Sequence, residues 1–177
     1  MSKSILSTVL SVISVTPARW VALTGSISDE LLRRPTEPGE WSALECLQHL
    51  LDMERYVFPV RVQLFLTGRD LAAFNPDEQG TKYQKPPAEL AVEFASLRAD
   101  SLKALGKVGL SDLALRSRHS ELGLVTLGEM LNEWAAHDLM HTVQAERALM
   151  QPFIAGSGAW RVYFRQHDVD ARDNPQA

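Results

Sequence analysis

Residues 126–151 read TLGEMLNEWAAHDLMHTVQAERALMQ, and this stretch carries the clearest helix signals in the chain. It opens with Thr126 and Glu129, the spacing of a capping box, in which each side chain satisfies a free backbone N–H of the first turn. Apolar residues then recur every three or four positions, at Leu127, Met130, Leu131 and Trp134. His141 lies on the same face of the predicted helix. The pattern predicts a long amphipathic helix that ends at Pro152.

Three further long helices are predicted from the same period of 3.6 residues. They cover about residues 3–24, 42–67 and 87–105. Gly25 is expected to stop the first helix, and Pro17 to kink or restart it. Ser42 and Glu45 form a second capping box, and Pro59 is expected to kink or split the helix that follows. No segment alternates convincingly in polarity as a strand would, so the sequence predicts an all-α protein.

Four long helices joined by loops of varied length predict a four-helix bundle, and the two longer connections suggest crossovers. A short extra C-terminal helix is expected in AWRVYFRQ, residues 159–166. We therefore predict a single domain over residues 1–168 and a frayed polar tail over residues 169–177.

The composition of the chain argues against several classes of function. The chain has 177 residues and a net charge of −4 without a basic cluster, which argues against nucleic-acid binding. The single cysteine, Cys46, excludes an intramolecular disulfide and fits a reducing compartment. The apolar N-terminal run keeps a stripe of serines at helical spacing, unlike a secretory signal, and no other run is long enough to span a bilayer. We expect a cytoplasmic protein without a membrane partner.

Histidines are the main candidates for chemistry. His137 and His141 lie one helical turn apart, so both imidazoles can face one point. A catalytic metal typically needs about three protein ligands. His49, in the middle of the second long helix, is the best third candidate, because His119 is expected in a loop and His167 in the tail. The pair alone is equally compatible with a structural role.

Spacing tests other metal motifs. A zincin needs H-E-x-x-H, but Asp138 occupies the second position. A di-iron bundle needs Glu-x-x-His, and the pairs Glu45…His49 and Glu133…His137 are one residue too wide. A His-Asp phosphohydrolase remains conceivable, although Asp138 is rotated by roughly 100° from His137 on a helix. Asp138 is therefore expected beside the site or in contact with another helix.

Four polar side chains are candidates for supporting roles around the histidines or in a pocket wall: Glu45, Asp52, Asp138 and Gln144. Glu45 is foremost a capping residue, whereas Gln144 shares a helix face with His137 and His141. Three other conspicuous side chains are expected in the core: Cys46, Trp41 and Trp134.

The segments EWSALECLQHLLDMER, residues 40–55, and VTLGEMLNEWAAHDLMHTVQAERAL, residues 125–149, together resemble the DinB-like superfamily of small helical bundles. The resemblance implies a divalent metal, zinc or nickel, bound by His49, His137 and His141. It also implies relatives that are thiol-dependent transferases and isomerases or proposed hydrolases, with homodimers common among them.

These observations predict a metal-dependent enzyme that acts on a small molecule, because a metal can activate either a low-molecular-weight thiol for transfer or water for hydrolysis. Thiol transfer is the first expectation. The alternatives are a noncatalytic protein, in which Asp138 or Glu45 completes a closed metal site, and a bundle without metal. Residues 74–85 and 160–164 are the expected lids of a pocket.

Overall fold

The computed structural model describes residues 2–170; residues 171–177 of the predicted polar tail lie outside the described residues. The long elements are α1 (Ser2–Ser26), α3 (Ala43–Asp52), the π-helix η1 (Met53–Val57), α4 (Phe58–Leu66), α6 (Pro87–Leu105) and α7 (Leu127–Gly156). The short ones are α2 (Asp29–Leu32), α5 (Pro76–Gln79), η2 (Asp112–Ala114), β1 (Arg116–His119), β2 (Gly123–Thr126) and η3 (Gly158–Phe164).

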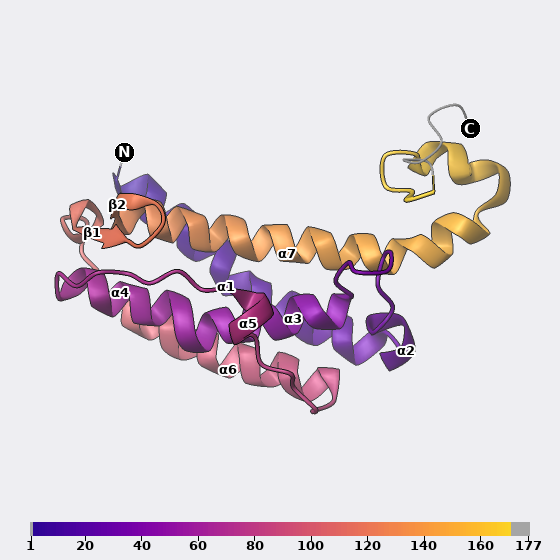
Figure 1. The fold of residues 1–177 in the computed structure, drawn as a ribbon, viewed down its shortest axis with the longest axis horizontal. Helices are drawn as coiled ribbons and strands as arrows, with labels where there is room; N and C mark the ends of the chain where they lie inside the picture. The colour runs from indigo at the N-terminus through magenta and orange to yellow at the C-terminus, as the bar shows by residue number, and fades with distance from the viewer. Residues whose placement is uncertain (1, 171–177) are drawn as a thin grey trace.

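The long helices form a four-helix bundle in which α3, η1 and α4 together make one arm (Figure 1). The principal packing pairs are α1 with α6, α1 with α7, α3 with α6 and α3 with α7. Successive arms α1 and α3 therefore lie diagonally, as do α6 and α7, so two connections cross the bundle. The predicted all-α bundle with crossover connections is confirmed.

Both predicted capping boxes are present. The Ser42 hydroxyl accepts the backbone N–H of Glu45 at 3.3 Å, and the Glu45 carboxylate accepts the backbone N–H of Ser42 at 2.8 Å. Thr126 and Glu129 repeat the arrangement at 3.2 and 2.7 Å. These boxes fix where α3 and α7 begin, and thus the register of the histidines that each helix carries.

Replacing Ser42 with alanine is expected to lower the free energy of unfolding by about 1 kcal/mol, because an N–H of the first turn loses its acceptor. Urea unfolding measures the change. Ser14→Ala is the matched control, since Ser14 lies exposed within α1 and its hydroxyl bonds only a carbonyl of its own helix. Equal stabilities of the two variants would contradict the capping role.

Prolines act differently at three positions. Pro59 splits its helix as predicted, and the chain accommodates the break by the π-helix η1 before α4. Pro17 lies inside an uninterrupted α1, which extends past the predicted stop at Gly25 to Ser26. The prediction that α7 ends at Pro152 is wrong, because the helix continues to Gly156.

A β-hairpin was not predicted. β1 and β2 pair antiparallel, with His119 opposite Gly123, and Gly123 takes the left-handed φ of 76° that closes the turn. The buried positions of β1 are Ser117 and His119 rather than apolar residues, so the strand has no hydrophobic alternation to detect. His119, expected in a loop, is therefore a buried strand residue.

Helix α1 combines an apolar composition with packing against two other helices of the bundle. Residues Ile5–Ser26 are long and apolar enough to cross a membrane by length and composition, a test that core helices and signal sequences also pass. In the structure α1 packs on α6 and α7 and buries Val9, Ile13 and Trp20. The stripe of serines opposite the apolar residues predicts this packing, because it is typical of an amphipathic helix in a bundle.

Candidate metal centre

Three imidazoles from two helices meet inside the bundle. His49 comes from α3, and His137 and His141 come from successive turns of α7, against which α3 packs. One ring nitrogen of each lies within 4.8 Å of the others, and the Nε2 atoms of His49 and His137 are 2.9 Å apart. Ring centroids are separated by 4.4 to 4.9 Å. The structure thus joins the three histidines that the sequence singled out.

The environment keeps these rings neutral. Burial, followed by the neighbouring imidazole of His141, lowers the pKa of His49 to about 4. Burial likewise lowers the pKa of His137 to about 2, and it lowers that of His141. A neutral imidazole has a free lone pair on one ring nitrogen, and this neutral form is the one that binds zinc or nickel.

Not all ring nitrogens of the cluster have a hydrogen-bond partner among the described residues. His137 Nδ1 is buried and has no hydrogen-bond partner among the described residues. The Nε2 atoms of His49 and His137 face each other, and a direct hydrogen bond between them would use only one of the two lone pairs. Three nitrogen donors in this state fit a divalent ion, which accepts lone pairs from all of them.

Gln144 orients one of the rings. Its Oε1 atom accepts a hydrogen bond from His141 Nδ1 at 2.9 Å, which leaves Nε2 of His141 unprotonated and available to the cluster. Of the four predicted supporting residues, Gln144 is the one whose side chain forms a hydrogen bond with a histidine of the cluster.

Asp138 is occupied elsewhere. Its side chain is fully buried and receives two hydrogen bonds from Arg98, Nη1 to Oδ2 at 2.6 Å and Nη2 to Oδ1 at 3.1 Å. Arg98 Nε also donates to Glu54 Oε2 at 2.8 Å. Asp138 therefore reaches across to another helix, which is one of its two predicted placements.

Glu45 and Asp52 also lie outside the cluster. The Glu45 carboxylate is committed to Ser42 in the capping box. Asp52 accepts the backbone N–H of Thr81 at 2.7 Å and the hydroxyl of Tyr83 at 2.5 Å, so it fastens the loop before α6. Neither residue contributes the fourth ligand that a closed metal site would need.

Aromatic rings hold the imidazoles in place. Trp41 stacks on His141 with 5.5 Å between centroids and also leans on His49. Phe58 meets His137 edge-on at 5.4 Å and stacks on the buried Trp134 at 4.8 Å. Trp134 is a core residue as predicted. Trp41 is only partly buried: it packs against a buried apolar cluster, as expected of a core side chain, and it also lines a cavity.

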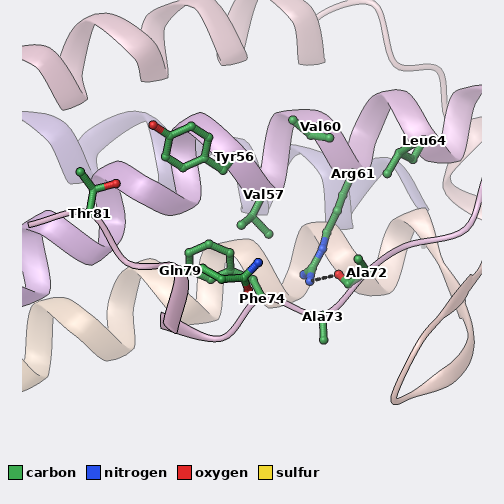
Figure 2. Close-up of a pocket in the computed structure, with 10 residues that line it drawn as sticks. All are labelled: Tyr56, Val57, Val60, Arg61, Leu64, Ala72, Ala73, Phe74, Gln79 and Thr81. Atoms are coloured by element: carbon green, nitrogen blue, oxygen red, sulfur yellow. Dashed lines mark hydrogen bonds between the residues drawn. The ribbon is translucent and has the colours of Figure 1, made fainter. Parts of the chain in front are cut away.

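The histidines border an open cavity of about 460 Å³. Its other walls come from η1, α4, the hairpin and the segment after Leu71, and include Met53, Arg61, Phe74, His119 and Glu133. Figure 2 shows that Arg61 and Phe74 also border a neighbouring cavity between α4 and residues 72–81. Arg61, His119 and Glu133 were not predicted as site residues.

One of the two expected lids takes part in the cavity. Phe74 and Pro76 line it, as expected of the 74–85 loop. The expected role of residues 160–164 is wrong, because the lining does not include them. Figure 1 shows the C-terminal segment at the opposite end of α7 from the hairpin, whose residues do line the cavity.

The fold and the cluster define a small helical bundle that carries three histidines on two facing arms. A family model for the DinB superfamily matches residues 13–145, and the chain belongs to that superfamily. The match includes all three histidines of the cluster.

One solved structure with the same fold is YfiT from Bacillus subtilis, described as a probable metal-dependent hydrolase with an unusual four-helix bundle topology. It superposes with a TM-score of 0.71 at 18% identity, over 84% of this chain and 87% of YfiT. At this identity the likeness concerns the fold alone. No curated protein sequence matches the chain.

Proposed function

We propose that this protein is a divalent-metal-dependent enzyme for a small molecule, with His49, His137 and His141 as the metal ligands. One observation carries the proposal: three neutral imidazoles converge at the wall of an open cavity, and the two carboxylates that might have closed the site, Glu45 and Asp138, are bonded elsewhere. A site with three protein ligands keeps a position open, which is typical of catalytic rather than structural metals.

A divalent metal held there supplies Lewis acidity, which makes a thiol or water more nucleophilic near neutral pH. The chain's own residues orient the ligands and shield them from solvent. Gln144 fixes the tautomer of His141, while Trp41 and Phe74 form an apolar wall beside the rings. Transfer of a low-molecular-weight thiol to an electrophile is the first candidate reaction, because an apolar wall accommodates an uncharged electrophile.

Hydrolysis is the second candidate, and Glu133 is the observation that favours it. Its carboxylate lines the same cavity one helical turn before His137. Partial burial raises the pKa of Glu133 even though Arg61 acts in the opposite sense. A carboxylate with a raised pKa is suited to accept a proton from an attacking water. The description of YfiT as a probable hydrolase is consistent with this alternative.

Metal analysis tests the proposed site. We expect about one zinc or nickel ion per purified chain, and almost none in His137→Ala, because two remaining imidazoles hold an ion weakly. His167→Ala is the control, since His167 is exposed and distant in sequence from the cluster. Equal metal content in wild type and His137→Ala would refute the site.

A second assay distinguishes the reactions. Metal-loaded protein is incubated with 2-mercaptoethanol and 1-chloro-2,4-dinitrobenzene, and separately with 4-nitrophenyl acetate. Loss of free thiol with release of chloride identifies transfer, whereas release of 4-nitrophenol without thiol identifies hydrolysis. If neither substrate reacts although the ion is bound, the noncatalytic alternative is favoured.

Gln144→Ala is expected to weaken metal binding by about 10- to 100-fold, because His141 loses the acceptor that fixes its tautomer. Competition with a fluorescent chelator measures the affinity. Gln63→Ala, an exposed position on α4, serves as the control and should retain wild-type affinity. An unchanged affinity in Gln144→Ala would show that the hydrogen bond does not tune the site.

A further inference from the structure

A second polar group lies in the cavity beside the histidine cluster. Arg61 extends from α4 toward the segment that carries Ala72, and its Nη2 donates to the Ala72 carbonyl at 3.1 Å (Figure 2). The same Nη2 lies 3.2 Å from His119 Nε2, which β1 presents from the opposite wall. The side chain of Arg61 is only 12% exposed, and His119 is 7% exposed. Both groups are therefore fixed in place by the fold.

The hydrogen bonds at Nδ1 of His119 determine which ring nitrogen carries the proton. His119 Nδ1 accepts the backbone N–H groups of Glu121 at 3.2 Å and Leu122 at 3.4 Å. Backbone donors cannot change direction, so Nδ1 must hold the lone pair. A neutral imidazole then carries its proton on Nε2. Consequently a ring N–H and a guanidinium N–H face each other at 3.2 Å; the Ala72 carbonyl accepts from the guanidinium, and among the described residues no hydrogen bond provides an acceptor for His119 Nε2.

The carboxylate of Glu133, which lies near Arg61, does not supply an acceptor for the two N–H groups that face each other. Glu133 Oε2 forms an ion pair with Arg61 Nη1 at 3.9 Å, but this distance is too long for a hydrogen bond, and the Glu133 side chain is 47% exposed. Two donors that converge in a partly enclosed site fit an anionic oxygen, which can accept from both. We propose that Arg61 and His119 bind a carboxylate of the substrate.

The surroundings favour a carboxylate over a doubly charged phosphate. Glu121, Glu129 and Glu133 also line this cavity, and their charges oppose a dianion more strongly than a monoanion. Glu129 is held by the capping box with Thr126, so it cannot withdraw easily. Arg61 is the only arginine or lysine among the described residues that line the cavity, so the site suits no more than one added negative charge.

The position of the Arg61–His119 site relative to the histidine cluster limits the kind of ligand that can bind. Glu133, the neighbour of Arg61, lies four residues before His137 on α7, which is roughly 6 Å along the helix axis. Met53, Phe74 and Met130 line the cavity as apolar walls. The ligand is thus a small carboxylic acid with an apolar body of a few carbons. That its far end reacts at the metal rests on the proposed function; the carboxylate site itself does not.

Calorimetric titration tests the inference with two probes of equal shape, 3-phenylpropionate and 3-phenylpropanol. The protein is used as purified and again after treatment with a chelator, so that a metal cannot be the partner of the carboxylate. We expect the acid to bind about tenfold more tightly than the alcohol, because charge-assisted hydrogen bonds exceed neutral ones by about this amount. Arg61→Gln should abolish the difference, and Arg61→Lys should keep part of it.

Arg19→Gln, a substitution of an exposed arginine on α1, is the matched control and should retain the full preference. Circular dichroism and thermal melting establish that each variant is folded. Equal binding of acid and alcohol by the wild type, or a preference that survives in folded Arg61→Gln, would overturn the carboxylate site. Metal content is measured in parallel. A preference shown by protein that carries no metal as purified would leave the carboxylate site intact and count only against the proposed metal enzyme.

Discussion

Replacing Arg98 with alanine is expected to lower the free energy of unfolding by about 3–5 kcal/mol, because it leaves two buried carboxylates without their cation. Arg98, Glu54 and Asp138 are each at most 1% exposed in their side chains. They form a charged layer between two apolar clusters, one around Phe58 and Trp134 and the other around Leu47 and Phe94. Burial raises the pKa of Glu54 even with Arg98 in contact, because the carboxylate is removed from water.

A further acceptor depends on Arg98. Pro17 has no N–H, so it cannot bond the carbonyl of Ile13 four residues before it in α1. Arg98 Nη1 donates to that carbonyl at 2.7 Å. The arginine therefore satisfies the backbone group that Pro17 leaves free, and this contact explains how α1 passes through a proline at a buried position.

Urea unfolding of Arg98→Ala is compared with that of Arg19→Ala. Arg19 pairs with Glu146 at 3.5 Å, but both side chains are about half exposed, at 50% and 52%, so its loss should cost about 0–1 kcal/mol. Arg98→Lys retains the charge without the bidentate geometry and should fall between the two. A similar loss in Arg98→Ala and Arg19→Ala would contradict the buried layer.

The features that could be predicted from the sequence are those encoded locally. The capping boxes at Ser42 and Thr126 place both site helices, and the four-residue spacing of His137 and His141 puts two rings on one face. His49 could be proposed as the third ligand only from its position in mid-helix. Its distance to the pair depends on the packing of α3 on α7, which no local pattern determines.

The missed features depend on contacts between distant segments. Arg98 follows Phe94 by four residues on a face that is otherwise apolar, and this pattern could have indicated a buried ion pair but not its partners. The cavity residue His119 lies on a strand of only four residues, which forms because a hairpin partner is nearby. Arg61 lies beside it through the break at η1 and Pro59, whose exact effect on helix direction the sequence does not specify.

Replacing Phe58 with alanine should have an effect of similar size, a loss of about 3–5 kcal/mol, because a large ring is removed from a packed core. Phe58 is 0% exposed, and its ring plane is within 7° of parallel to that of Trp134. The same ring supports the edge of His137, so the cavity left behind lets that imidazole change position.

The two consequences are measured separately, stability by urea unfolding and metal binding by competition with a chelator. Phe153→Ala makes the same substitution at a side chain that is 67% exposed on α7, and it should change stability by no more than about 0.5 kcal/mol. Phe58→Leu fills most of the volume and should recover much of the stability. If Phe58→Ala is destabilised but binds metal as tightly as the wild type, then Phe58 stabilises the bundle without positioning His137; a stability equal to that of Phe153→Ala would contradict its place in the core.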